Sequence, residues 1–241
     1  MSLFFPADNR PGAKAIRELA CTSGGFSISI DPAENGRSET GWLELLANGL
    51  TFDLTGLSPS RAAPTPDVRH AYGFGSVPDT RLMEAITLLP GPHLGNSIGM
   101  VPVLRWMAML GAQLADLPGT AGVLWHGAAT CCAPDYFRRN VRDWIAGGAF
   151  PGLALTALSD REDGGLQSEG LALFTGQELI VTPQMCEDRP FAAKTALRLV
   201  DWLVQNGRVE SPIVFTGPDG DPVGLDPADD GLTIQVWKGA R

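Results

Sequence analysis

Hydrophobic positions in the first quarter of the chain change from helical to alternating spacing. The helical spacing covers 9–21, and the alternating runs cover 26–30, 41–47 and 50–54. Asn48 and Gly49 separate the last two runs, and this pair is the strongest short signal for a β-hairpin turn. Residues 1–60 are therefore predicted to form an N-terminal α+β lobe, with a helix beside a small antiparallel sheet.

Regular spacing is lost between residues 58 and 78, where proline and glycine are frequent. We interpret 61–80 as a surface connection, followed by a C-terminal α/β domain over 81–241; one continuous globular unit is also compatible with the pattern. The stretch Gly73-Phe74-Gly75 stops one glycine short of a nucleotide-binding loop, so it gives little support to a nucleotide site.

Beyond residue 80, candidate strands and helices alternate. Runs typical of strands lie at 82–89, 121–126, 152–158, 178–182, 213–217 and 232–237, and helical spacing lies at 98–117, 134–146 and 189–206. This β-α-β-α order requires crossover connections and favours parallel pairing. The predicted fold class is α/β, mixed with α+β character. It has a small N-terminal antiparallel sheet with a helix, then a larger mixed sheet with β-α-β-α crossovers and a closing helix.

The order of these segments is similar to that of a bacterial family of uncharacterised proteins with a C-terminal domain of unknown function. The resemblance covers about residues 82–225, and its closest pieces are Gly122 to Trp125, Gly164-Gly165 and Gly217 to Gly224. It implies an α/β architecture and contributes no chemistry, because it brings no known activity or catalytic residues.

Composition and charge restrict the compartment and the partners. The chain has 241 residues, 44% of them hydrophobic, and a net charge of -9. An acidic chain without a lysine or arginine run repels a phosphate backbone, so we expect no nucleic acid and favour a protein partner with a basic surface. The first residues lack a signal-peptide pattern, which favours a cytoplasmic protein. Arg105 inside the apolar stretch 97–117 favours a buried helix over a membrane span. A homo-oligomer stays open.

The turn between the strand at 121–126 and the helix at 134–146 holds the strongest chemical signal, His126 with Cys131 and Cys132. Because a helix N-terminus lowers thiol pKa, Cys132 with His126 is a candidate catalytic pair; the alternative is that buried cysteines only pack. The spacing does not match the pairs that zinc usually takes. We therefore predict no metal and no cofactor.

Backbone amides at the start of the same helix offer an anion-binding alternative, with Thr130, Arg138 and Arg142 as candidate ligand-binding residues. Arginines at this spacing more commonly pair with nearby acids on the helix surface. The acidic loops at 159–165 and 217–231 do not follow the spacing that wraps a calcium ion, so we expect solvated turns there.

The absence of catalytic motifs and the acidic charge favour a non-catalytic protein-binding module with an acidic surface. The alternative is a small-anion binder, or a thiol- and histidine-dependent enzyme, with its site at the N-terminus of the helix at 134–146.

Overall fold

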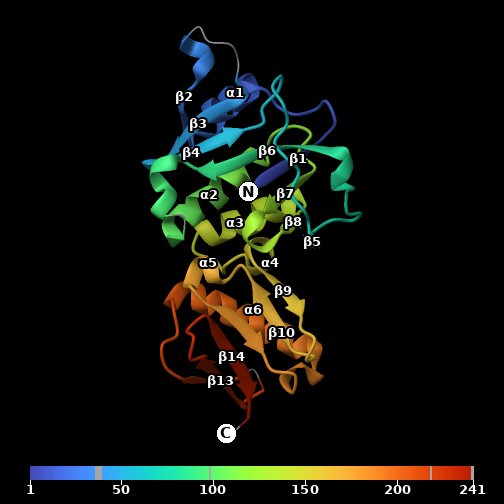
Figure 1. The fold of residues 1–241 in the computed structure, drawn as a ribbon, viewed down its shortest axis with the longest axis vertical. Helices are drawn as coiled ribbons and strands as arrows, with labels where there is room; N and C mark the ends of the chain where they lie inside the picture. The colour runs from blue at the N-terminus through green and yellow to red at the C-terminus, as the bar shows by residue number, and fades with distance from the viewer. Residues whose placement is uncertain (36–39, 98, 218, 240–241) are drawn as a thin grey trace. The chain divides into compact units, whose positions relative to one another are not determined.

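The computed structural model describes residues 1–35, 40–97, 99–217 and 219–239, and it divides the chain into two compact units. Unit 1 is Met1–Gly148 and unit 2 is Ala149–Arg241. Each unit holds one mixed sheet with helices, which confirms the α/β class at this level (Figure 1).

The division between the units lies at residues 148 and 149, not in the segment 61–80 where we predicted a connection. That segment is built into unit 1. The amide of Ala63 donates to the carbonyl of Ala85 at 3.0 Å, and His70–Tyr72 form strand β5. A proline-rich stretch is thus held by backbone hydrogen bonds to a sheet, which composition alone does not reveal.

The sheet of unit 1 has eight strands in the order β2-β3-β4-β6-β1-β7-β8-β5. They are β1 (Ser2–Pro6), β2 (Ser27–Ile30), β3 (Trp42–Ala47), β4 (Leu50–Thr55), β5 (His70–Tyr72), β6 (Met83–Pro90), β7 (Gly122–Trp125) and β8 (Thr130–Cys132). Neighbouring strands are antiparallel, except β5 and β8, which are parallel. The β3–β4 hairpin turns at Asn48 and Gly49, whose φ values of 50° and 77° confirm the predicted turn.

Strand β1 has a central position in this sheet that the sequence did not reveal. It pairs antiparallel with β6 on one side and with β7 on the other. The strands predicted at 82–89 and 121–126 are therefore parallel to each other but not adjacent, which corrects the direct pairing that their order suggested. Phe4 and Phe5 are each 0% exposed. A strand buried on both faces shows no alternation of apolar and polar residues.

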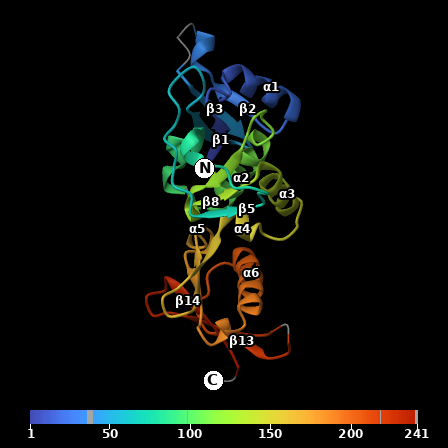
Figure 2. The ribbon, with the colours of Figure 1, turned by 90° about the vertical axis from the view of Figure 1, so that its right-hand side faces the viewer.

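Helices α1 (Ala13–Ser23), α2 (Val101–Leu114) and α3 (Pro134–Ile145) lie along one side of this sheet (Figure 2). Helix α2 is buried over most of its surface because it packs on β6, α1 and α3. The three predicted helices of this region are present. Helix α1 begins and ends later than predicted, α2 is shorter, and α3 ends one residue earlier. Residue 98, where α2 was predicted to start, lies outside the described residues.

Unit 2 contains a six-stranded sheet in the order β12-β13-β14-β11-β10-β9. Its strands are β9 (Ala157–Asp160), β10 (Leu166–Glu169), β11 (Glu178–Val181), β12 (Ile213–Thr216), β13 (Pro222–Pro227) and β14 (Thr233–Lys238), and its helices are α4 (Gly152–Leu155), α5 (Ala172–Thr175) and α6 (Arg189–Asn206). Strands β11 and β14 are parallel, and the other neighbours are antiparallel. The closing helix lies at the predicted place, with Gly207 at its end as predicted, and the Asp188 side chain caps its start.

Two local predictions for unit 2 are wrong. The run at 152–158 begins as α4 and continues as β9, and the Thr156 hydroxyl donates to the carbonyl of Gly152 at 2.6 Å where the helix ends. The Gly/Pro/Asp stretch before β14 contains strand β13. A glycine allows this pairing, because a Cβ on Gly224 would lie 2.1 Å from Cε2 of Trp237 on β14.

A buried amide side chain fixes the segment between α6 and β12. Gln177 is 0% exposed, and its Oε1 accepts a hydrogen bond from the amide of Val209 at 2.8 Å. Its Nε2 donates to the carbonyl of the same residue at 3.0 Å. One side chain therefore satisfies both backbone polar groups of Val209, a residue outside the strands of the sheet.

Candidate functional site

The predicted site begins in the interior of the unit 1 sheet, since β7 lies between β1 and β8. The chain does not pass directly from β7 into α3. It turns through a short 3-10 helix, His126–Ala128, and forms β8, which pairs antiparallel with β7. Ala129 makes this turn with a positive φ of 50°. The start of α3 is therefore separated from His126 by a second strand.

The His126 imidazole is directed toward strand β1. Its Nε2 lies 2.9 Å from the hydroxyl oxygen of Ser2, which lies 2.9 Å from the hydroxyl oxygen of Thr87 on β6. The residue is exposed as a whole, but desolvation of its ring and, to a smaller extent, the nearby amino terminus lower the pKa of His126 to about 4, so the ring is neutral at pH 7. The Ser2 hydroxyl therefore links neighbouring strands. Because Ser2 is 0% exposed, this hydroxyl is inaccessible to a substrate. The imidazole thus takes part in a structural hydrogen-bond chain.

Both thiols of the predicted site are buried on β8. Burial raises the pKa of Cys131 to about 12, and it raises the pKa of Cys132 as well. The thiolate is the nucleophilic form of cysteine, and these thiols are protonated at pH 7. This environment is the reverse of the electropositive, accessible one that activates a catalytic cysteine.

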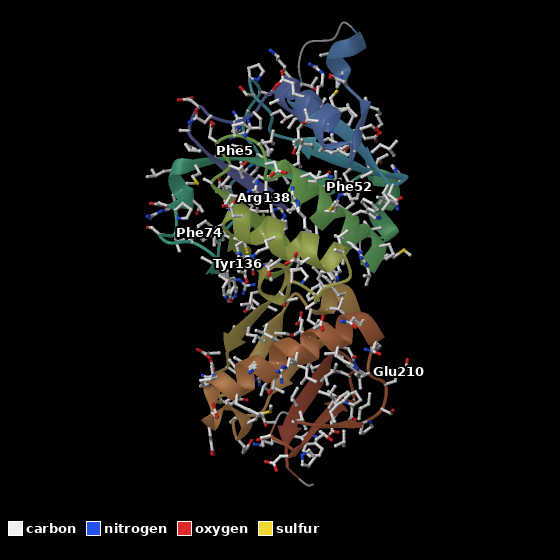
Figure 3. All side chains as sticks on the ribbon, turned by 180° about the vertical axis from the view of Figure 1, so that it is seen from behind. Phe5, Phe52, Phe74, Tyr136, Arg138 and Glu210 are labelled. Atoms are coloured by element: carbon white, nitrogen blue, oxygen red, sulfur yellow. The ribbon has the colours of Figure 1, made fainter. Side chains whose placement is uncertain are left out.

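The three predicted anion-binding residues do not converge on one point. Thr130 is buried, and its hydroxyl donates to the carbonyl of Ala128 at 3.4 Å. Arg138 forms ion pairs with Asp135 and Asp116, and Arg142 binds the same Asp116 at 2.6 Å. Figure 3 shows Arg138 on α3. The arginines therefore have carboxylate partners within the protein, as the surface-pair alternative predicted.

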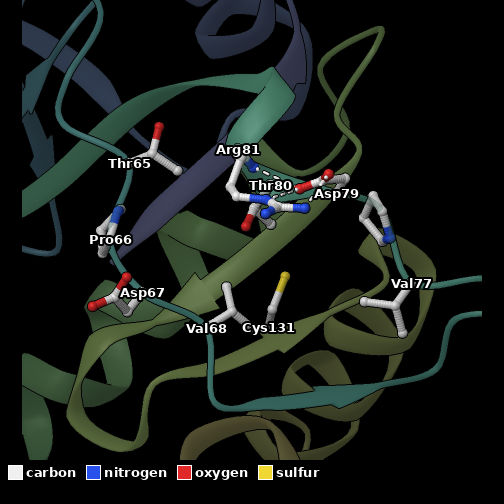
Figure 4. Close-up of a pocket in the computed structure, with 10 residues that line it drawn as sticks. Thr65, Pro66, Asp67, Val68, Val77, Asp79, Thr80, Arg81 and Cys131 are labelled. Atoms are coloured by element: carbon white, nitrogen blue, oxygen red, sulfur yellow. Dashed lines mark hydrogen bonds and ion pairs between the residues drawn. The ribbon is translucent and has the colours of Figure 1, made fainter.

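A pocket of about 520 Å³ in unit 1 reaches one of these thiols (Figure 4). Its walls come from residues 65–68 and 77–81, and Cys131 lies at its base. At the rim, Arg81 binds Asp79 at 2.9 Å and holds the pKa of that carboxyl below its usual value. We did not predict this pocket, because its walls belong to the segment that we took for a surface connection. Val68 and Val77, two apolar residues among the prolines, are the signal that could have indicated it.

The acidic loops of unit 2 carry several ion pairs. Asp163 binds Arg161 at 3.1 Å, and Asp221 binds Lys238 at 3.2 Å. Across the described part of the chain, no group of three or more histidine, cysteine, aspartate or glutamate residues is placed to hold a metal ion.

A different surface of unit 2 combines charge with an exposed apolar side chain. We call it the 210–232 patch and define it by Glu210, Asp229, Asp230 and Leu232. The three acids are exposed and form no ion pair with any described residue, and Leu232 is 61% exposed. Arg208 joins the two loops of the patch by donating to the carbonyl of Gly231 at 2.6 Å. Figure 3 labels Glu210 in the loop that precedes β12.

No protein-family model, curated protein or solved structure matches this chain. The similarity to an uncharacterised bacterial family therefore stays a prediction. Among the described helices, none is long and apolar enough to cross a membrane.

Proposed function

We propose that this chain is a cytoplasmic, non-catalytic binding protein whose unit 2 docks a partner protein with a basic surface. The observation that carries this proposal is the uneven distribution of charge. Unit 2 has fourteen Asp and Glu against seven Lys and Arg, whereas unit 1 has thirteen against eleven. A field of one sign on one unit attracts a partner of the opposite sign and raises the rate of encounter.

The 210–232 patch is the docking surface that fits this field. The amide of the exposed Leu232 donates to the Asp230 carboxylate at 2.8 Å, so a partner that carries lysine or arginine around one apolar side chain would match the patch in both charge and hydrophobicity. Long-range attraction sets the on-rate of such an encounter, and burial of the apolar contact slows dissociation.

The alternative site at the start of α3 has less support from the geometry. Its thiols are buried with raised pKa values, and its arginines already bind Asp116. An anion would have to displace these ion pairs before it could bind.

The test uses a model peptide of alternating lysine and leucine, titrated into the full chain by calorimetry at low and at high salt. The variant is Glu210→Lys/Asp229→Lys, and the control is Glu162→Lys/Glu187→Lys, which changes the net charge equally outside the patch. We expect the patch variant to bind at least about tenfold more weakly than the control, because close charge pairs in an interface contribute more than distant ones.

Equal weakening by both variants would show that net charge alone attracts the peptide and would refute the patch. No saturable binding by the unaltered chain at low salt would overturn the proposed function itself. Leu232→Ser should weaken binding without changing its salt dependence, since it removes only the apolar contact.

A further inference from the structure

Unit 2 contains a second kind of site, a pocket of about 240 Å³ between α6 and strands β12 and β13. Helix α6 contributes Thr195, Arg198 and Trp202, which are spaced so that they lie on one face of the helix. Phe215 on β12 completes an aromatic wall, because its ring centroid lies 4.9 Å from that of Trp202 in an edge-to-face arrangement at 73°.

Thr195 lines this pocket with a side chain whose buried hydroxyl is left without a partner. Thr195 is 5% exposed, and its Oγ1 has no hydrogen-bond partner in the described structure. Other helical or helix-end threonines here bond the carbonyl four residues earlier, as Thr22 does with Glu18 at 3.0 Å and Thr175 with Leu171 at 3.3 Å. A buried hydroxyl without a partner is unfavourable. Because this oxygen is closed off from solvent, a ligand atom in the pocket removes the penalty only when the Thr195 side chain turns its hydroxyl toward the pocket.

Arg198 supplies the charge. It is exposed and lines the pocket, and it makes no ion pair with a described residue. The other described arginines of unit 2 all have partners: Arg161 binds Asp163, Arg189 binds Asp160, and Arg208 binds the carbonyl of Gly231. In so acidic a unit, a guanidinium beside an apolar pocket and without a carboxylate partner is a recognition group for an anion.

We infer that this pocket binds a small monocarboxylic acid with an aromatic or branched aliphatic body. The body packs against Trp202 and Phe215, and the carboxylate accepts charged hydrogen bonds from Arg198. On binding, the Thr195 side chain turns so that its hydroxyl donates to the same carboxylate or bonds a polar substituent. Thr195 and Arg198 are one helical turn apart, close enough to hold one group together. The volume is below the 300–1,000 Å³ that is usual for larger ligands, which restricts the body to about one ring. The negative charge of unit 2 disfavours a second carboxylate.

This inference is independent of the proposed docking function, because the pocket and the 210–232 patch share no residue. A failure of one experiment therefore leaves the other proposal standing.

The test titrates 3-phenylpropionate, 4-methylpentanoate and the neutral 3-phenylpropanol into the full chain by calorimetry, with transfer of magnetisation from the ligand to the Trp202 indole as the location readout. Arg198→Gln removes the charge at the pocket. Lys194→Gln is the matched control, because it removes an exposed charge from the same helix outside the pocket lining. Thr195→Val removes the hydroxyl and keeps the shape.

We expect saturable binding of both acids and much weaker binding of the alcohol. Arg198→Gln should weaken acid binding at least about tenfold, as loss of a charged hydrogen bond predicts, while Lys194→Gln leaves it within about twofold. Thr195→Val should weaken binding without lowering the melting temperature. Absence of saturable binding at millimolar concentration, equal affinity for the alcohol, or unchanged affinity in Arg198→Gln would each overturn the assignment.

Discussion

Replacement of Gln177 by methionine tests how unit 2 holds the segment that leads into β12. Methionine has a similar length but cannot form hydrogen bonds with the backbone of Val209, which is 2% exposed. The substitution leaves one amide and one carbonyl buried without partners. Each such group costs about 1–3 kcal/mol, and part of this cost is recovered when the loop around Val209 relaxes so that water reaches its backbone. We therefore expect Gln177→Met to lower the free energy of unfolding of unit 2 by about 2–4 kcal/mol.

The assay is urea unfolding of the full chain, followed by fluorescence and circular dichroism, together with hydrogen exchange at the Val209 amide. The control is Gln205→Met, the same chemical change at an exposed glutamine whose Nε2 binds only Asp201 at 3.0 Å. It should change stability by less than about 0.5 kcal/mol. If Gln177→Met is as stable as Gln205→Met, or if exchange at Val209 does not accelerate, the side chain does not hold this segment and the reasoning fails.

Three further predictions concern thiols, packing and pH. In the folded chain, the exposed Cys21 should react rapidly with a thiol reagent such as dithionitrobenzoate, and the three buried cysteines should react slowly. Equal reaction rates for all four cysteines would contradict the described burial. Gly224→Ala should lower the unfolding free energy by about 1–3 kcal/mol, because the added Cβ would collide with Trp237. Gly75→Ala is the control, since a Cβ there meets open space and should leave the unfolding free energy unchanged. The urea unfolding midpoints of the two variants provide the comparison. For His126, the unfolded chain binds a proton near pH 6.5 and the native chain near pH 4, so native stability should fall as pH falls across this window. The variant His126→Gln should lose this part of the pH dependence in the same urea assay, and an unchanged pH profile would contradict the shifted pKa.

Local signals in the sequence predicted the elements that local chemistry determines. Asn48-Gly49 is a pair that adopts positive φ readily, so the hairpin could be identified without its neighbours. Helix α6 has a cap at Asp188 and a terminating Gly207, and its ends agree with those predicted. In both cases the residues that fix the conformation lie within a few positions of it.

Pairing between distant segments could not be predicted in this way. Strand β1 is identified by its partners β6 and β7, and neither the length nor the pattern of residues 2–6 indicates them. The sequence of strand β13 resembles that of a loop, because proline and glycine are frequent in it. In the structure, Gly224 leaves room for the side chain of Trp237 on β14. Tertiary contacts override local preference at such positions.

The candidate chemistry depended on orientation, which spacing does not give. Sequence placed His126 close to Cys132, and in the structure the imidazole binds Ser2, more than a hundred positions away along the chain. The pocket around Thr195 was missed because threonine inside a helix carries no sequence signal of its own. Only the structure shows that its hydroxyl lacks a partner.

The central place of β1 has a consequence for synthesis of the chain. Residues 2–6 are synthesised well before their neighbours in the sheet, residues 83–90 and 122–125. The apolar stretch Leu3–Phe5 therefore lacks one of its two sheet partners until residue 90 has been made, and the other until residue 125 has been made. Unit 1 is therefore expected to fold cooperatively, and only after residue 125 has been synthesised. Truncation before residue 122 should yield a species that chaperones retain.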